Sequence, residues 1–374
     1  MTESVIKEML ARIDVRINGS RPSDIQIHDD RLFSRVIRQG SLGLGEAYME
    51  GWWDCEALDQ FFYRVIHGQL EKHFRLNLPV LLGIVAYRLR NLQSVARARM
   101  VAVGHYDFGN DVFVAMLDPG MQYSCGYWKG AENLEQAQQN KMEMICRKLG
   151  LRPGMRVLDI GCGWGGLGRY MAAHYGVHVT GITVSKAQAA YAQAHSEGLD
   201  AEWLLEDYRS LSGKYDRIVS VGMFEHVGHK NYAVFMETAR RLLEKDGLFL
   251  LHTIGSNKKT LSVDPWIEKY IFKNGILPSI AQIGEAISGR FIMEDWHNFG
   301  ADYDKTLMAW ERNFSRGREQ GRFTCSETVF RMFRYYLLSC AGAFRARDLQ
   351  LWQIMLSPGG VAGGYARPEL AGRA

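Results

Sequence analysis

The fold of this chain is decided by the stretch Val157-Leu158-Asp159-Ile160-Gly161-Cys162-Gly163-Trp164-Gly165-Gly166. An apolar strand here runs into a loop whose glycines can turn tightly and come close to a ligand. The GxGxGG spacing differs from the GxGxxG fingerprint of dinucleotide-binding loops, although helix-packing glycines alone could produce either spacing. A predicted helix follows at 166–174. The order strand, loop, helix therefore predicts a ligand cradle at this turn.

The residues around the loop continue a regular alternation of apolar strands and amphipathic helices. The predicted strands and intervening helices are, in order, strand 156–160, helix 166–174, strand 178–184, helix 185–194, strands 201–205 and 215–221, helix 231–243 and strand 247–253. Parallel neighbours need crossover helices, so the pattern predicts an α/β fold with a doubly wound parallel sheet. Ligands of such folds bind at the carboxyl ends of the strands. A further strand is predicted at 349–356, after an aromatic and mainly helical region.

The composition excludes several classes of protein. A chain of 374 residues with 47% hydrophobic and 23% charged residues has room for two folded domains. Its six cysteines show no CxxC pair and no spacing of a zinc site or disulfide framework, so we expect reduced thiols in a cytoplasmic protein and no metal. The sequence begins without the pattern of a signal peptide and contains no apolar run that could span a bilayer. With a net charge of only +4, no nucleic-acid partner is expected.

The chain is predicted to divide into three regions. Residues 1–75 form a small α/β domain, with helices at 5–10 and 32–37 and strands at 15–17 and 25–27. Its glycine-rich stretch at 40–45 is not favoured as a nucleotide loop, because a helix precedes it where a strand is required. Residues 76–100 form a linker helix, apolar first and then basic: five arginines and no acidic residue lie between Arg75 and Met100. This segment fits a membrane surface and a packed interdomain helix equally well. Residues 101–374 form the catalytic domain.

Polar groups follow two of the predicted strands. Glu225 and His226 come after strand 215–221, and His252 lies near the end of strand 247–253. Their positions place them beside the glycine loop. From the residues alone, Glu225 could equally be a helix cap or an exposed carboxylate, and His252 a core histidine. Glu225, His226 and His229 do not form the HExxH pattern of metalloproteases.

Six blocks of sequence, together with the glycine loop, carry a resemblance to a known family. The glycine loop resembles motif I of class I S-adenosylmethionine-dependent methyltransferases, and the blocks are similar to those of the bacterial cyclopropane-fatty-acyl-phospholipid synthases. They run from His105 to Asp111, Met121 to Trp128, Gly222 to Gly228, Leu250 to Gly255, Trp296 to Tyr303 and Cys340 to Arg345. The resemblance covers essentially the whole chain. It implies a doubly wound, seven-stranded, Rossmann-like methyltransferase domain with a small N-terminal α/β domain.

The resemblance also implies a reaction and its cofactors. A methylene group passes from S-adenosylmethionine to the cis double bond of an unsaturated phospholipid acyl chain. A carbocation forms, and a bound bicarbonate removes the proton whose loss closes the cyclopropane ring. The bicarbonate is held by residues that match Cys125, Glu225, His252, Ile254 through its backbone, and Tyr303. Cys340 matches a residue of the family's active site, and we expect it to line the site rather than act as the base.

The family pattern gives a second set of residues for S-adenosylmethionine. They are Tyr123, Ser124, Asp159, Gly161, Cys162, Gly163, Trp164, Gly165, Gly166, Thr183, Val184, Ser185, Gln188, Tyr208 and Arg209. The triplet 183–185 departs from the common pattern, in which an acidic residue at the end of the second strand holds the ribose. Aromatic side chains are expected to shield the carbocation from water, and the candidates are Tyr123, Phe224, Tyr303 and Tyr336.

The resemblance further implies partners and a location. We expect a homodimer attached peripherally to the phospholipid bilayer, at the inner face of the cytoplasmic membrane, with Trp52 and Trp53 as an anchor. One alternative is an ordinary methyltransferase acting on nitrogen or oxygen of a lipid headgroup or small molecule. Another is a catalytically silent binding protein of the membrane surface. The intact blocks around Cys125, Glu225, His252 and Tyr303 argue against both.

Overall fold

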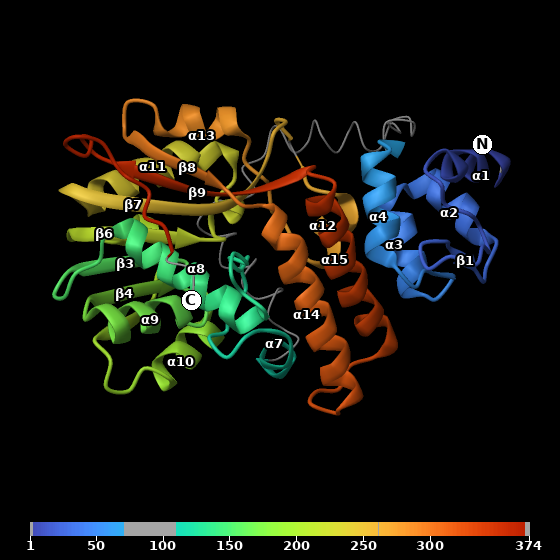
Figure 1. Ribbon diagram of the computed structural model, residues 1–374, viewed down its shortest axis with the longest axis horizontal. Helices are drawn as coiled ribbons and strands as arrows, with labels where there is room; N and C mark the ends of the chain where they lie inside the picture. The colour runs from blue at the N-terminus through green and yellow to red at the C-terminus, as the bar shows by residue number, and fades with distance from the viewer. Residues whose placement is uncertain (1–2, 71–109, 261, 371–374) are drawn as a thin grey trace.

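The computed structural model describes residues 3–70, 110–260 and 262–370 (Figure 1). The predicted linker helix at 76–100 and the first residues of the block at 105–111 lie outside these ranges. No helix within the described ranges is both long enough and apolar enough to cross a membrane.

A seven-stranded sheet forms the larger half of the molecule. Its strand order is β5-β4-β3-β6-β7-β9-β8. The strands are β3 (Arg156–Ile160), β4 (His178–Thr183), β5 (Ala201–Leu205), β6 (Tyr215–Val221), β7 (Leu243–Ser256), β8 (Ile292–Asn298) and β9 (Leu349–Ser357). The five strands from β5 to β7 are parallel, which confirms the doubly wound prediction. The last two pairings, β7 with β9 and β9 with β8, are antiparallel, so the sheet is mixed, and β8 was not predicted.

Helices cover both faces of this sheet (Figure 1). One face carries α8 (Leu134–Leu149), α9 (Gly166–Tyr175) and α10 (Lys186–Ala194), and the other carries α11 (Tyr232–Leu242) and α13 (Ile280–Ile287). Successive strand residues point to opposite faces. On β6, for example, Ile218 packs into the core beneath α11 and Val219 into the core beneath α8 and α9. Two apolar layers therefore fix the strand ends at which a ligand can bind.

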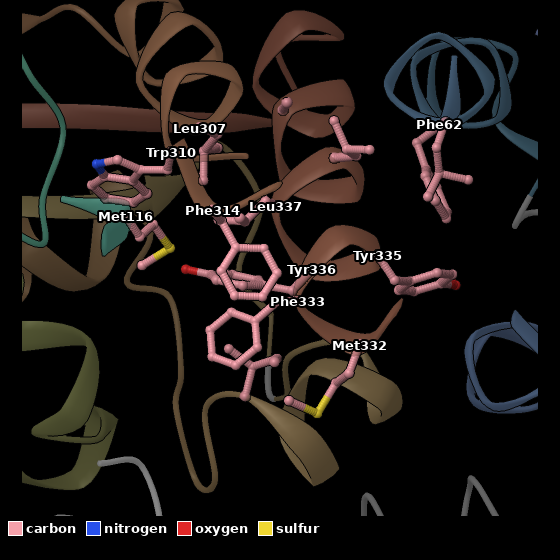
Figure 2. Close-up of a cluster of buried hydrophobic side chains, with 14 of the residues drawn as sticks. Phe62, Met116, Leu307, Trp310, Phe314, Met332, Phe333, Tyr335, Tyr336 and Leu337 are labelled. Atoms are coloured by element: carbon pink, nitrogen blue, oxygen red, sulfur yellow. The ribbon is translucent and has the colours of Figure 1, made fainter. Parts of the chain in front are cut away.

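A helical layer stands beside the carboxyl ends of the strands. It is built from α7 (Asn110–Met116), α12 (Pro265–Tyr270), α14 (Ala301–Glu319) and α15 (Glu327–Arg345). Figure 2 shows Phe333, Tyr336 and Leu337 of α15 among Trp310 and Phe314 of α14, while Tyr335 points the other way. The ring of Tyr335 meets Phe62 at a centroid distance of 5.0 Å. Both sides of α15 are thus buried.

The N-terminal module packs on the far side of α15. It comprises α1 (Glu3–Arg12), β1 (Gln26–Ile27), α2 (Arg31–Gln39), α3 (Ser41–Met49), β2 (Trp53–Asp54) and α4 (Leu58–His67). The predicted helices and the strand at 25–27 are confirmed. The predicted strand at 15–17 is wrong, since only an isolated bridge joins Ile17 to Ile25. The glycine-rich stretch at 40–45 begins α3, where a side chain in place of Gly45 would collide with the indole of Trp266.

The prediction that Trp52 and Trp53 anchor the chain to a membrane is wrong for Trp53. Trp53 is fully buried, and its indole nitrogen donates a 3.0 Å hydrogen bond to the carbonyl of Leu44. Trp52 is half-buried, and the guanidinium groups of Arg31 and Arg35 lie 4.6 and 4.7 Å from its ring centroid. Trp53 is therefore part of the core of the module and cannot reach a bilayer surface. Sequence alone could not separate a buried aromatic pair from an exposed one.

Candidate functional site

A large cavity of about 680 Å³ opens where the carboxyl ends of β3, β4, β6 and β7 face the helical layer. Its walls come from the glycine loop, the ends of these strands, the segment between β7 and α13, and helices α14 and α15. Two helices of the N-terminal module also contribute, through Leu44 of α3 and Phe62, Val65 and Ile66 of α4. The cavity therefore extends from the predicted cofactor loop to the junction between the two parts of the chain.

The glycine loop adopts the conformation that its sequence requires. Gly161, Gly163 and Gly165 have φ values of +85°, +55° and +79°, a region that other residues seldom occupy. A Cβ on Gly161 would press on Met223, and one on Gly166 would overlap the carbonyl oxygen of Gly120. The predicted cradle is thus a tight turn with its backbone open to the cavity.

Most of the residues predicted to bind the cofactor line this cavity. They are Tyr123, Ser124, Asp159, Gly161, Cys162, Gly163, Trp164, Thr183, Val184, Ser185, Gln188, Tyr208 and Arg209. Gly165 and Gly166 do not line it. Gly165 precedes α9 as its N-cap, and Gly166 is the first residue of that helix, packed against the loop that carries Gly120.

The segment 183–185, which lacks the acidic residue expected to hold the ribose, is held in place by its own hydrogen bonds. Thr183 donates to the side-chain oxygen of Gln188 at 2.8 Å, and Ser185 caps α10. Two acidic side chains on the cavity wall follow β5 instead, Glu206 and Asp207, and Asp207 is paired with Arg209.

A buried lysine that the sequence did not single out supports this wall. Lys141 of α8 is fully buried and donates to Gln122 at 2.5 Å and to Ser124 Oγ at 2.8 Å. Burial lowers the pKa of Lys141 to about 8 and raises the pKa of nearby Asp159 to about 7. Lys141 therefore fixes the segment that presents Tyr123 and Ser124 to the cavity. Its position in a helix rich in Gln, Glu and Lys gave no sign that it points inward.

Glu225 is the central polar group of the cavity. The short helix 224–226 that follows β6 turns its carboxylate inward, where Oε1 accepts a 2.7 Å hydrogen bond from the backbone nitrogen of Ile254. The other oxygen, Oε2, is buried and has no hydrogen-bond partner among the described residues. Burial raises the pKa of Glu225 to about 7. The carboxylate is therefore poised to take up or release a proton, with one oxygen available.

His252 lies on β7, two residues before Ile254 and on the same face of the strand. Its ring is buried, and Nδ1 accepts a 3.2 Å hydrogen bond from the amide of Gln353. Burial holds the pKa of His252 well below its ordinary value, so the ring is neutral. Nε2 has no hydrogen-bond partner among the described residues. The ring thus has one nitrogen bonded to Gln353, while the other, Nε2, is buried with its bonding capacity unused.

Cys125 and Tyr303 complete the predicted set. Burial raises the pKa of the Tyr303 hydroxyl, and interactions with Cys125 and Glu225 raise it further. The thiol of Cys125 is fully buried with its pKa likewise raised, and its sulfur lies 3.2 Å from the carbonyl oxygen of Gly126. Glu225, Ile254 and Tyr303 line the large cavity, whereas Cys125 and His252 lie behind its wall.

Cys340 and three of the four candidate aromatic residues line the cavity, and the fourth does not. Cys340 lines the cavity, and burial raises the pKa of its thiol to about 12, so the sulfur is not a thiolate at neutral pH. Tyr123, Tyr303 and Tyr336 also line the cavity, and Tyr123 donates to the hydroxyl of Tyr336 at 3.1 Å. Phe224 does not; it is fully buried and stacks on Tyr232 beneath the sheet.

The arrangement combines a glycine cradle, a mostly aromatic and apolar chamber, and a small set of buried polar groups held in neutral forms. No group of His, Cys, Asp and Glu suited to a metal ion occurs among the described residues. Such a chamber can hold an apolar substrate and a reactive cation away from water while offering few nucleophiles.

Comparison with known proteins gives a consistent set of relatives. Residues 93–354 match the family model described as mycolic acid cyclopropane synthetase. The cyclopropane-fatty-acyl-phospholipid synthase of Escherichia coli K12 is 57% identical over 355 residues, which cover 95% of this chain and 93% of that protein.

Two solved structures are similar to about 70% of this chain. The cyclopropane synthase MmaA2 from Mycobacterium tuberculosis has 33% identity and a TM-score of 0.65, and the match covers 71% of this chain and 99% of that one. The mycolic acid cyclopropane synthase CmaA1 complexed with SAH and CTAB has 36% identity and a TM-score of 0.64, and it covers 69% and 97% of the two chains.

Proposed function

Because this chain belongs to the mycolic acid cyclopropane synthetase family, we propose that it transfers a methylene group from S-adenosylmethionine to a cis double bond in the acyl chain of an unsaturated phospholipid. The observation that carries the proposal is the position of Glu225. Its carboxylate is fixed to Ile254 at 2.7 Å beside Tyr303, in the same cavity as the glycine cradle.

The residues of the cavity suit a methyl donor and an apolar acceptor together. The glycine loop, Tyr123, Ser124 and the 183–188 turn form the end that fits S-adenosylmethionine, and CmaA1, complexed with SAH, is similar over this region. Leu307, Phe272 and the α4 side chains form an apolar continuation that fits an acyl chain. The electron-rich double bond can then reach the sulfonium methyl group in a space from which water is excluded.

The proton lost during ring closure requires a base, and we infer a bound bicarbonate in that role. Two buried atoms that lack partners among the described residues form a matching pair, an acceptor at Glu225 Oε2 and a donor at His252 Nε2. Bicarbonate carries both an O–H donor and acceptor oxygens, so it satisfies both atoms, with Tyr303 as a further donor. Bicarbonate supplies a small general base that can reach a carbon-bound proton inside an apolar chamber.

The protein groups around this base have distinct tasks. His252, neutral because of its burial, donates through Nε2 and adds no competing positive charge. Glu225 accepts a proton or hydrogen bond and so increases the basicity of the group that it contacts. Cys125 and Tyr303 remain protonated because burial raises both pKa values, so neither is a nucleophile that could trap a carbocation. Tyr123, Tyr303 and Tyr336 present aromatic faces that stabilise positive charge.

The proposal is tested with the full chain, S-adenosylmethionine and vesicles of a monounsaturated phospholipid, followed by mass spectrometry of the acyl chains and headgroups. We expect one CH2 unit gained per converted chain and lost alkene protons by NMR. Rates should fall in carbon dioxide-depleted buffer and return when bicarbonate is added. Methylation confined to headgroups would identify the nitrogen or oxygen methyltransferase alternative, and no transfer would refute the enzyme proposed here.

We also propose that the chain works as a homodimer attached peripherally to the inner face of the cytoplasmic membrane. Its acyl substrates are buried in a bilayer, and the basic segment between Arg75 and Met100 suits anionic headgroups. Flotation of the full chain with anionic vesicles, but not with zwitterionic ones at high salt, is the expected result. Sedimentation of a species twice the chain mass would support the dimer, and a monomer at working concentrations would refute it.

The domain division proposed for the chain keeps the boundaries 1–75, 76–100 and 101–374. Within the described residues, Arg345 of α15 links the two main parts, since it donates to Asp59 at 2.6 Å and to Asp304 at 2.8 and 2.9 Å. The N-terminal module is therefore firmly packed on the catalytic region, and its helix α4 supplies part of the cavity wall.

A further inference from the structure

A row of polar side chains crosses three neighbouring strands behind the cavity. His252 of β7 is paired in register with Gln353 of β9, and Gln353 is paired with His297 of β8. Lys148, near the end of α8, reaches this row from the helix that covers the same face of the sheet. All but His297 are almost completely buried. Buried polar groups of this kind are costly unless each one is satisfied, so their arrangement is informative.

The hydrogen bonds in the row run in one direction. Lys148 Nζ donates to Gln353 Oε1 at 2.9 Å and to His297 Nδ1 at 3.0 Å. Burial lowers the pKa of Lys148 to about 7, so below that pH Nζ is an ammonium group. An ammonium group is only a donor, so the atom of Gln353 that faces it must then be the amide oxygen. The amide nitrogen of Gln353 must then point the other way, toward His252 Nδ1 at 3.2 Å. Because an NH2 group is only a donor, Nδ1 of His252 is forced to be an acceptor and the ring proton must lie on Nε2.

We propose that Lys148 and Gln353 are positioning residues that lock the tautomer of His252, so that its Nε2–H is presented as a donor to the anionic base of the reaction. The inference rests on the proposed function for its catalytic consequence, but the tautomer itself is a property of the protein alone. A free neutral histidine exchanges between two tautomers, and only the one with the proton on Nε2 can donate to an anion at that side. Fixing the tautomer in advance means that no reorganisation is needed during the reaction.

The other titratable groups near Lys148 do not orient the amide of Gln353. Asp295 Oδ2 lies 4.0 Å from Lys148 Nζ and is itself paired with Arg367. His297 accepts from Lys148, and burial lowers the pKa of His297 to about 4, so it remains neutral. Lys148 has therefore two neutral acceptors in hydrogen-bond contact, and Gln353 is the one that leads toward the cavity.

The change that tests the proposal most directly is Gln353→Glu. It keeps the size of the side chain but replaces the amide NH2 by an acceptor oxygen, which can still bind Lys148. His252 must then donate from Nδ1, so its proton leaves Nε2 and the ring presents a lone pair to the base. Gln350→Glu is the matched control, because Gln350 is a buried glutamine of the same strand that points to the opposite face and bonds Asn298 and Arg347.

The tautomer is read by 15N NMR of the full chain with labelled histidines at a pH below 7, where Lys148 is an ammonium group and His252 is neutral. The samples contain no S-adenosylmethionine or bicarbonate, and the His252 signals are those lost in His252→Gln. We expect a single neutral form protonated on Nε2 in the wild type and in Gln350→Glu, and protonation on Nδ1 in Gln353→Glu. Lys148→Met frees the amide to rotate, so a mixture of the two tautomers is expected. A wild-type ring protonated on Nδ1, or an unchanged tautomer in both test variants, would overturn the proposal.

Kinetics on the same proteins give the catalytic consequence. We expect kcat of Gln353→Glu to fall on the order of 10- to 100-fold, with the Kd for S-adenosylmethionine changed by less than about twofold, since His252 lies outside the cofactor cradle. An altered tautomer with unchanged kcat would also overturn the proposal. If even the wild type converted no alkene, the proposed function would fail, while the NMR spectra would still decide the tautomer.

Discussion

Glu225→Gln should make the protein more stable and nearly inactive at the same time. The carboxyl group titrates near 4.5 when exposed, and burial raises the pKa of Glu225 to about 7. Between these values the folded protein binds a proton that the unfolded chain has released. The stability contributed by this group is therefore full below pH 4.5 and is lost as the pH rises through 7.

The size of this loss follows from the two pKa values. At 1.36 kcal/mol per pKa unit, the ionised carboxylate costs the folded state about 3 kcal/mol above pH 7. Glutamine has almost the same shape, keeps an oxygen for the 2.7 Å bond from Ile254 and cannot ionise. The variant should thus gain up to about 3 kcal/mol at pH 8, less the cost of one unpaired amide nitrogen. With an unfolding entropy of roughly 2.1 cal/mol/K per residue, this raises Tm by roughly 4 °C at most.

The assay is thermal unfolding of wild type and Glu225→Gln at pH 4.5 and pH 8, alongside activity and S-adenosylmethionine binding at pH 8. The stability difference should appear at pH 8 and nearly vanish at pH 4.5, and kcat should fall on the order of 100- to 1000-fold with cofactor affinity retained. The exposed Glu197→Gln serves as control and should change neither property. A variant less stable than the wild type at pH 8, or a difference independent of pH, would refute the reasoning.

Three further changes probe separate features of the structure. Gly166→Ala places a Cβ onto the carbonyl oxygen of the facing loop, so calorimetry should show binding of S-adenosylmethionine weakened at least about tenfold, and unchanged binding and Tm would contradict the packing. Cys340→Ala should retain kcat within about threefold, because a thiol whose pKa is raised to about 12 is not a nucleophile; a hundredfold loss would give the sulfur a chemical role. Arg345→Met leaves Asp59 and Asp304 without their shared cation. Denaturant unfolding should show that the free energy of unfolding falls by about 2–4 kcal/mol. A fall of less than about 0.5 kcal/mol would mean that the ion pairs contribute little to the junction.

The polar groups in the cavity wall and directly behind it share one electrostatic feature. Burial shifts the pKa of Glu225, Cys125 and Tyr303 upward and that of His252 downward, and each shift favours the uncharged form. A site of neutral groups can accept one small anion and one transient cation without an internal counter-charge that would hold either too tightly. The same burial is the source of the stability cost predicted for Glu225.

Much of this protein could be predicted from its sequence. The glycine loop and the alternation around it gave the doubly wound sheet, because hydrophobic periodicity and the conformational freedom of glycine are local properties. The blocks of family resemblance predicted site residues that lie far apart in the sequence. The fold brings three of them, Glu225, Ile254 and Tyr303, to one cavity. Each of these features can be recognised from a short stretch of sequence.

Other features were decided only by the tertiary structure. The antiparallel strand β8, the burial of Trp53 and the inward direction of Lys141 and Lys148 gave no local signal, because lysines in a charged amphipathic helix normally face solvent. Each depends on partners far away in the chain: Lys148 is satisfied by side chains some 150 and 205 residues further on. The sequence alone determined the cradle and the chemistry that it can hold. Only the packed sheet determined which nitrogen of His252 meets the amide of Gln353, since hydrogen-bond partners are set by neighbours across strands and not by position along one.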